Sequence, residues 1–106
     1  MDIQLKRGLL EICVLKILSR GASYGYRIVK DVSGCIEISE STLYPILKRL
    51  ESGGLVSARS AEHNGRLRRY FRITPAGNHR IEQFLEEWEE VMRVYEFIKE
   101  NGRDKE

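Results

Sequence analysis

Residues 41–52 read STLYPILKRLES, a stretch that separates into two faces when it is drawn as a helix. At about 100° per residue, one face collects the large apolar residues Leu43, Ile46, Leu47 and Leu50. The opposite face collects Ser41, Pro45, Lys48 and Ser52, with Thr42 and Arg49 on one flank and Tyr44 on the other. A short polar face without acids can approach base edges and phosphates in a major groove. The same pattern also fits an ordinary amphipathic surface helix, so the neighbouring segments are needed to distinguish a DNA-contacting helix from an ordinary one.

Both ends of this helix carry recognisable signals. Ser39 or Ser41 is the expected N-cap, after a short extended stretch at residues 36–38. Gly53-Gly54 ends the helix near Ser52. Pro45 lies near the first turns, where a missing N–H costs least.

A hairpin is predicted after the helix. Residues 55–59 and 67–73 are the expected strands, and the Asn64-Gly65 pair between them favours a tight turn. The hairpin carries five arginines, with Glu62 as the one nearby carboxylate: Arg59, Arg66, Arg68, Arg69 and Arg72. Charge on an edge strand also prevents unwanted pairing. Contacts with phosphates or with a minor groove explain better than protection of an edge strand why these charges are positive.

Two further helices are predicted upstream. Residues 3–19 are dense in apolar residues on more than one side, which indicates a helix buried against two partners. Arg20-Gly21 ends this helix, and Ser23 is the expected N-cap of a second, short helix from Tyr24 to about Val32. Three helices followed by an arginine-rich hairpin predict a winged helix-turn-helix, in a chain of mainly α class with a small β-hairpin (α+β).

The last segment predicts a long helix that needs a partner. Thr74-Pro75 combines an N-cap with a proline at the first helical position. The apolar residues then keep a seven-residue repeat, in the series Ile81, Trp88, Tyr95 and Phe84, Val91, Ile98, with Leu85 and Met92 beside them. About 25 helical residues span about 37 Å, more than the preceding domain needs for cover. The expected partner is therefore a second copy of the chain, and the alternative is that the stripe packs only on the chain's own first helix.

Three segments are expected along the chain: a winged helix-turn-helix DNA-binding domain at residues 1–74, a C-terminal dimerisation helix at residues 75–100 and a polar tail at residues 101–106. The first and last helices share the expected dimer contacts: Leu5, Leu9, Ile81, Phe84, Trp88, Val91 and Tyr95.

Charge is distributed unevenly along the 106 residues, of which 42% are hydrophobic and 32% charged. Residues 1–72 carry 13 Lys and Arg against 7 Asp and Glu, whereas residues 73–106 carry 5 against 9. The basic part suits a polyanionic partner. No apolar run approaches the roughly 20 residues of a membrane-spanning helix, and the N-terminus lacks the features of a secretory signal. We therefore expect a cytoplasmic protein that does not engage a membrane.

The sequence offers little for catalysis or metal binding. His63 and His79 are isolated, and no nucleophile–base pair, paired acids or metal-ligand spacing stands out, so no enzyme activity, metal or cofactor is expected. Cys13 lies in an apolar helical run, and Cys35 follows Gly34 in a predicted turn. A disulfide between the two is open on sequence grounds but is not expected in a non-secreted chain.

Six blocks resemble the signature blocks of PadR-family transcriptional regulators, in order and at compatible spacings over about residues 3–98. They are Tyr24-Gly25-Tyr26, Ser41-Thr42-Leu43-Tyr44-Pro45, Leu47-Lys48-Arg49-Leu50-Glu51, Gly54-Leu55-Val56, Arg68-Arg69-Tyr70-Phe71 and Ile73-Thr74-Pro75-Ala76-Gly77. A single long helix after the wing resembles the short-tailed branch, whose members are dimers joined through their first and last helices. The chain departs from the family pattern at Ser41, where Gly is frequent, at Ala22-Ser23, where a Pro is common, and at Leu67, where Pro often precedes the basic pair.

The resemblance implies a sequence-specific repressor that acts as a homodimer on double-stranded operator DNA. The expected DNA contacts are Tyr24, Ser41, Thr42, Tyr44, Lys48, Arg66 and Arg68. Some short-tailed relatives bind flat, apolar compounds near a tryptophan that resembles Trp88, so Trp88 and Met92 could hold a small aromatic effector. The alternative, which we favour, is that Trp88 packs the dimer core. A winged helix used only for protein–protein contact is the other function class to be tested.

Overall fold

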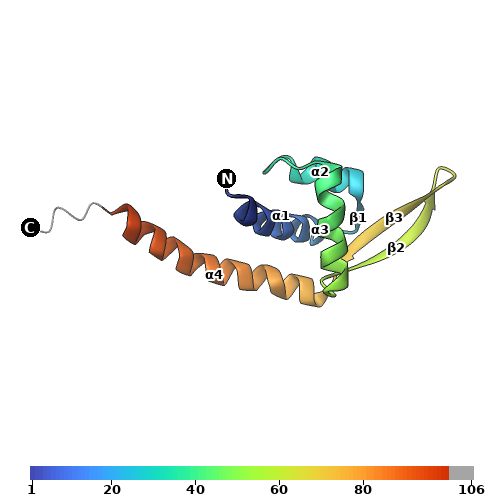
Figure 1. Ribbon diagram of the computed structural model, residues 1–106. Helices are drawn as coiled ribbons and strands as arrows, with labels where there is room; N and C mark the ends of the chain where they lie inside the picture. Colours follow the sequence, from blue (N-terminus) through green and yellow to red (C-terminus); the bar gives the residue numbers. More distant parts are fainter. Residues whose placement is uncertain (101–106) are drawn as a thin grey trace, which may run out of the picture.

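The computed structural model describes residues 1–100 and contains a winged helix-turn-helix followed by one long helix (Figure 1). In chain order the elements are α1 (Ile3–Leu18), β1 (Ser23–Tyr24), α2 (Gly25–Val32), α3 (Glu40–Ser52), β2 (Val56–His63), β3 (Arg66–Ile73) and α4 (Pro75–Lys99). This mainly α architecture with a small sheet confirms the predicted fold class. The predicted polar tail at residues 101–106 lies outside the described residues. None of the helices in residues 1–100 has the length and apolar character needed to cross a membrane.

Side-chain caps set where three of the helices begin. The Ser39 hydroxyl accepts the N–H of Thr42 at 3.3 Å, and the Thr74 hydroxyl accepts the N–H of Gly77 at 3.1 Å. Asp2 caps α1 in the same way, through the N–H of Leu5 at 3.0 Å. The predicted caps at Ser39 and Thr74 are confirmed, because each depends only on residues three positions away.

The sheet has three strands and not the predicted two. Its order is β1-β3-β2 with antiparallel pairing, and β1 contributes Ser23 opposite Phe71 and Tyr24 opposite Tyr70. The predicted helix cap at Ser23 is therefore wrong: Ser23 is a strand residue, and α2 begins one residue after Tyr24. The backbone of this segment pairs with a strand far along the chain, which outweighs the local tendency of serine to cap a helix.

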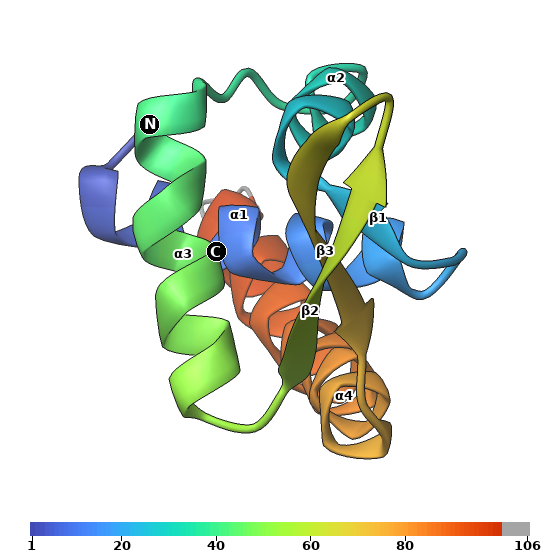
Figure 2. The same cartoon turned by 90° about the vertical axis from the view of Figure 1, so that its right-hand side faces the viewer.

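The wing is the hairpin of β2 and β3, and its turn has the predicted geometry. Asn64 and Gly65 have φ values of 53° and 79°, as a two-residue hairpin turn with left-handed backbone at both positions requires. Pairing runs from Val56 opposite Ile73 to His63 opposite Arg66, so the strands extend further toward the tip than predicted. Figure 2 shows the twisted wing standing beside α3.

One apolar core holds the first three helices against the sheet. It is built from Leu10, Val14, Leu15, Leu18, Ile28, Val32, Ile38, Leu43, Ile46, Leu47, Leu50, Val56 and Phe71. The helix α1 contacts α2, α3, α4 and β3, in agreement with the prediction that it is buried on more than one side. Because α3 buries its apolar face in this core, its polar face is left at the surface beside the wing.

The long helix α4 starts against the base of the wing and then leaves the rest of the molecule (Figure 1). At the start of α4, Gly77 packs closely against the base of the wing, because a Cβ at this position would overlap the carbonyl oxygen of Leu55 and the side chain of Ile73. Ile81, Phe84 and Trp88 are partly buried, whereas every residue from Val91 to Lys99 is exposed. The structure is 72 Å long and only 26 Å and 20 Å in its other two dimensions.

Candidate nucleic-acid interface

The exposed face of α3 carries the side chains that the sequence placed there. Ser41, Tyr44, Pro45, Lys48 and Ser52 are exposed, while the apolar face of the helix is buried. Pro45 is inside the helix and has no N–H to donate to the carbonyl of Ser41, so this surface also presents a backbone acceptor. The face is therefore polar and accessible along the whole helix.

A groove of about 570 Å³ separates α3 from the wing and brings together residues from α2, α3 and β3. It is lined by four of the predicted DNA contacts: Tyr24, Tyr44, Arg66 and Arg68. Lys48 lies further along α3, in a smaller hollow of about 400 Å³ that it shares with Glu51 and Arg69. The predicted acid-free face of residues 41–52 is confirmed, but the helix begins one residue earlier, and Glu40 in its first turn borders the groove.

Within this groove, Tyr24 holds Arg68 in place. The guanidinium carbon of Arg68 lies 3.9 Å from the centre of the Tyr24 ring, a close cation–π contact. Tyr24 is also in contact with Tyr70, whose ring packs edge-on against it with the ring centres 5.7 Å apart. Pairing of β1 with β3 creates this stack, since it sets Tyr24 opposite Tyr70. The stack presents the Arg68 cation from a fixed position.

Gly25 fixes the position of Tyr44 across the same groove. A Cβ at Gly25 would overlap the hydroxyl oxygen of Tyr44, so the glycine leaves room for this side chain in its present position against the start of α2. The sequence gave Gly25 no role of its own. Its place between two tyrosines was the available signal, but the contact with Tyr44 depends on how α2 packs against α3.

Two ion pairs tie α3 to its neighbours and correct one prediction about the wing. Arg49 donates to Glu11 on α1 through Nε at 3.0 Å and through an Nη at 2.7 Å. Arg69 on β3 donates to both oxygens of Glu51, at 2.9 and 2.8 Å. The expectation that Glu62 is the one carboxylate near the wing arginines is therefore wrong, because the end of α3 supplies Glu51. Arg66 and Arg68 have no carboxylate partner among the ion pairs of residues 1–100.

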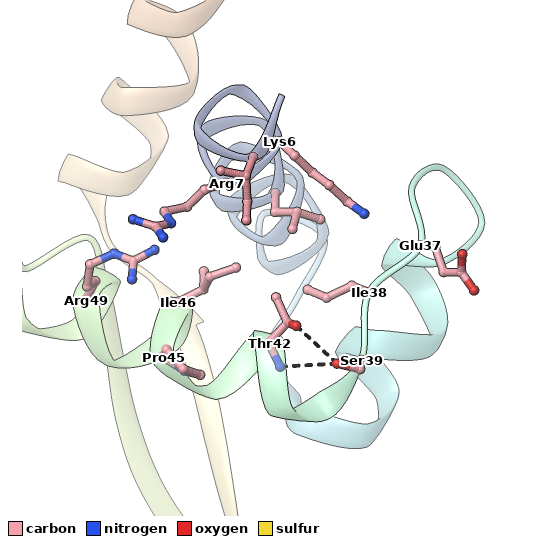
Figure 3. Close-up of a pocket in the computed structure, with 11 residues that line it drawn as sticks. Lys6, Arg7, Glu37, Ile38, Ser39, Thr42, Pro45, Ile46 and Arg49 are labelled. Carbon is pink, nitrogen blue, oxygen red and sulfur yellow. Dashed lines mark hydrogen bonds between the residues drawn. The ribbon is translucent and has the colours of Figure 1, made fainter. Parts of the chain in front are cut away.

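A second hollow of about 600 Å³ lies on the other flank of α3, between this helix and α1 (Figure 3). Thr42 lines this cleft and not the wing groove, and its hydroxyl accepts a hydrogen bond from Ser39 at 3.1 Å. Arg7 of α1 points toward Arg49 across the cleft, while Lys6 extends toward Ile38 (Figure 3). Thr42, a predicted DNA contact, thus lies on the α1 flank of α3, and Ser41 is also absent from the residues that line the wing groove.

The predicted dimer and effector residues lie along α1 and α4. Leu5 is exposed, Leu9, Ile81, Phe84 and Trp88 are partly buried, and Val91 and Tyr95 are exposed. The rings of Phe84 and Trp88 pack with their centres 5.6 Å apart and their planes tilted by 35°. Met92, the other predicted effector contact, is exposed one turn further along. Leu85 and Ile98, which belong to the predicted repeat, are exposed as well, and the exposed Val94 and Phe97 lie outside that repeat.

Comparison with known proteins connects this arrangement to a family. Residues 14–83 match the transcriptional regulator PadR-like family. This chain belongs to that family. The match includes the whole segment from α2 to β3, and it confirms the resemblance inferred from the sequence blocks. PadR-like proteins are transcription regulators and not enzymes, as the lack of a catalytic constellation suggested.

Individual relatives of the PadR-like chain agree in sequence and fold. A transcriptional regulator from Clostridium thermocellum is 33% identical, with a TM-score of 0.82 over 94% of this chain and 99% of its own. Transcriptional regulator Rv3488 of Mycobacterium tuberculosis is 41% identical over 56 residues, which are 53% of this chain and 52% of that protein. PadR of Bacillus subtilis, solved in complex with operator DNA, is 22% identical with a TM-score of 0.67 over 73% of this chain and 46% of its own. This last likeness is one of fold.

The three departures from the PadR pattern can now be located. The Ser41 hydroxyl lies 3.0 Å from that of Ser39 at the start of α3, and Leu67 is 81% exposed on the wing. Ser23 is buried, and its hydroxyl has no hydrogen-bond partner within residues 1–100. Leu67 lines the wing groove, and none of these residues belongs to the apolar core of the PadR-like fold.

Proposed function

We propose that this PadR-like regulator is a sequence-specific DNA-binding repressor that acts as a homodimer. The observation that carries the proposal is the wing groove, in which Tyr24, Tyr44 and Arg68 face the same open space beside the polar surface of α3. PadR of Bacillus subtilis, which has the same fold, was solved with operator DNA, and this supports a DNA-facing role for the corresponding surface. Residues 1–74 would form the DNA-binding domain and residues 75–100 the dimerisation helix.

In this proposal α3 enters a major groove and contacts base edges. Ser41, Tyr44 and Lys48 are exposed on it and offer hydroxyl and ammonium groups suited to base edges and nearby phosphates. Thr42 remains a proposed contact from the flank of the helix. Two copies related by a twofold axis would place their α3 helices in successive major grooves, about 34 Å apart.

The wing and the start of α2 are proposed to hold the DNA backbone. Arg68 is fixed against Tyr24, so less side-chain entropy is lost when it meets a phosphate. Arg66 is exposed next to the turn of the wing, where it can reach a phosphate or a minor groove. Arg69 and Arg49 are already paired with carboxylates, and we do not assign them to the DNA contact.

The homodimer is proposed to form through α4 together with α1. Along α4 the repeat residues Val91 and Tyr95 are 41% and 48% exposed, so a large part of the stripe has no cover within one copy. On α1, Leu5 is 44% exposed and would extend the same apolar surface. A second copy would bury both.

A direct test measures binding of the full chain to duplex DNA from upstream of its own gene by fluorescence anisotropy. We expect Lys48→Ala and Arg68→Ala each to weaken binding by about tenfold. The Arg68 variant should also reduce the salt dependence by about one counterion, since it removes a phosphate contact. Lys99→Ala, at the end of α4 far from the wing, is the matched control and should bind normally (Figure 1).

Two outcomes would contradict the proposal. Unchanged affinity in both variants would remove the assignment of these residues to the DNA surface. Equal, weak binding to the upstream DNA and to a scrambled duplex would favour a winged helix used for protein–protein contact. Size-exclusion chromatography with light scattering on the same samples reports whether the chain is a dimer.

Effector control is a further part of the proposal. Trp88 packs against Phe84 and has Met92 one turn away, so a flat apolar molecule could insert beside it where two α4 helices meet. The competing role for Trp88 is packing in the dimer core. Trp88 fluorescence titrated with a panel of aromatic compounds separates the two roles, since quenching by none of them would favour packing.

A further inference from the structure

The cleft between α1 and α3 carries two cations that the proposed DNA contacts do not include. Lys6 and Arg7 line the cleft from α1, and Thr42 and Pro45 line it from α3. Arg7 is exposed and Lys6 is partly buried. Neither cation has a carboxylate partner among the ion pairs of residues 1–100, so both are available to an anion from outside the chain.

The acidic residues near the cleft leave Arg7 without compensation. Arg7 points toward Arg49 across the cleft (Figure 3), but the carboxylate of Glu11 is already engaged by Arg49, at 2.7 and 3.0 Å. Glu37 also lines the cleft and points away from both arginines (Figure 3). An arginine without an acidic partner suits a phosphate, which its guanidinium can bind through two parallel hydrogen bonds.

The position of this cleft matches the second edge of a major groove. The start of α1 and the wing lie on opposite sides of α3 (Figures 1 and 2). Pro45 belongs to the exposed polar face of α3 and also lines the cleft, so the two surfaces are continuous. A major groove is about 12 Å wide and a helix with its side chains about 10–12 Å, so a helix in the groove has a phosphate backbone on each side. The wing faces one backbone, and the start of α1 lies toward the other.

Two further features fit the α1 flank to a backbone. The Thr42 hydroxyl accepts a hydrogen bond from Ser39 at 3.1 Å and donates to no group within residues 1–100, so its proton is available to a phosphate oxygen. On α1, Arg7 lies about 160–200° around the helix axis from Leu5 and Leu9, the proposed dimer contacts. One helix can therefore present its leucines to a second copy and Arg7 to the cleft.

We propose that Lys6, Arg7 and Thr42 bind the DNA backbone at the edge of the major groove opposite the wing. This inference rests on the proposed function, because α3 must enter the groove for α1 to meet the second backbone. Phosphate contacts position a protein on DNA and carry no direct base information. The α1 surface therefore raises the affinity for any duplex and holds α3 in the groove from the side opposite Arg66 and Arg68.

The surface is tested by fluorescence anisotropy of the full chain on the upstream duplex and on a scrambled duplex, over a range of salt concentrations. Arg7→Gln and Lys6→Ala should each weaken binding to both duplexes by the same factor, about fivefold, and lower the salt dependence by about one counterion. Lys16→Ala, in the last turn of α1 and outside the lining of the cleft, is the matched control and should bind normally.

A scan with methylphosphonates, each of which removes the charge of one phosphate, locates the contact on the DNA. Neutral phosphates on both edges of the major groove should weaken binding of the unaltered chain several-fold. Those that meet α1 should have no further effect in Arg7→Gln but should keep their full effect in Arg68→Ala. A scan in which no phosphate responds to Arg7, or in which the same phosphates respond to both arginines, would overturn the proposal.

The outcomes separate this proposal from the proposed function. Specific binding by the unaltered chain, with the affinity and salt dependence unchanged in Arg7→Gln, would overturn the α1 surface alone. Equal binding to the two duplexes, with the Arg7 effect present on both, would remove the sequence-specific regulator and leave the α1 surface standing. A change from dimer to monomer in Arg7→Gln, measured by light scattering, would assign the cleft to association between copies and overturn the phosphate contact.

Discussion

Two regions of the molecule differ in how far their apolar side chains are exposed. One is the winged-helix body, from α1 to β3, and the other is the distal part of α4, residues 91–99. In the body, Leu15, Ile28 and Leu43 are at most 1% exposed, because helices and sheet form two layers around one core. In the distal part of α4, the apolar side chains lie at the surface: Val91, Met92, Val94, Tyr95, Phe97 and Ile98. The body therefore buries its apolar side chains within one chain, whereas the apolar side chains of the distal helix have no second layer that covers them.

The size of the uncovered surface indicates what should cover it. Burial of a large apolar side chain is worth about 1.5–3 kcal/mol, so several such residues left in water favour association strongly. Phe97 follows Tyr95 by two residues and so lies about 200° around the helix axis from it. One partner helix cannot cover both faces, which favours a partner that contributes α1 as well as α4.

The largest expected effect comes from making the same substitution in the body and on α4. Leu47→Ala in the body removes a side chain that is 1% exposed and should lower the free energy of unfolding by about 2–5 kcal/mol. Leu85→Ala on α4 removes one that is 58% exposed and should cost less than about 1 kcal/mol in the isolated copy. Urea denaturation at protein concentrations low enough to keep the copies apart measures both.

The matched pair controls for side-chain chemistry, since both changes are leucine to alanine. Equal costs for the two variants in the dilute protein would mean that α4 is covered within one chain, and the contrast between the regions would be lost. At high concentration, the cost of Leu85→Ala should rise as the second copy covers the helix.

Features set by neighbouring residues could be predicted from the sequence. The caps at Ser39 and Thr74 each satisfy an N–H three residues away, and the Asn64-Gly65 turn depends on backbone conformations that these two residues adopt readily. The two-faced pattern of residues 41–52 likewise placed the polar face of α3 at the surface. In each case the deciding interaction lies inside the segment.

Features made by distant segments could not be predicted in this way. Ser23 is a good helix cap locally, but it pairs with Phe71 in the sheet, and the pairing prevails. The partners of Arg49 and Arg69 are 38 and 18 residues away, so charge counting along the wing missed both ion pairs.

A charged side chain in the exposed apolar stripe of α4 should prevent two copies of the chain from associating. Val91→Glu should leave the body folded, because Val91 is not part of the core, but two glutamates would meet across the proposed dimer seam. The chain should become a monomer in light scattering, and operator affinity should fall by about 100-fold through loss of the second binding site. Arg93→Glu, which adds a glutamate two residues away on the polar side of the repeat, is the control. A dimeric Val91→Glu protein would show that the seam lies elsewhere.

The smallest expected effect comes from the contact between Gly25 and Tyr44 at the surface of the body. Gly25→Ala places a methyl group where the Tyr44 hydroxyl lies, so either α2 or Tyr44 must move, at a cost of about 1–3 kcal/mol in stability. Movement of Tyr44 should also weaken operator binding several-fold, since Tyr44 lines the wing groove. Thermal unfolding and fluorescence anisotropy measure the two effects.

A double-mutant cycle with Tyr44→Ala identifies the cause of that cost. Truncation of Tyr44 removes the atoms that overlap the new methyl group, so Gly25→Ala should then cost little, and the two changes should couple by about 1 kcal/mol or more. If Gly25→Ala is equally destabilising in both backgrounds, the glycine is needed for the start of α2 itself and not for Tyr44. Coupling would instead mean that the space left open at Gly25 sets the geometry of the groove proposed to face DNA. That groove is formed within one copy of the chain, so its geometry does not depend on association.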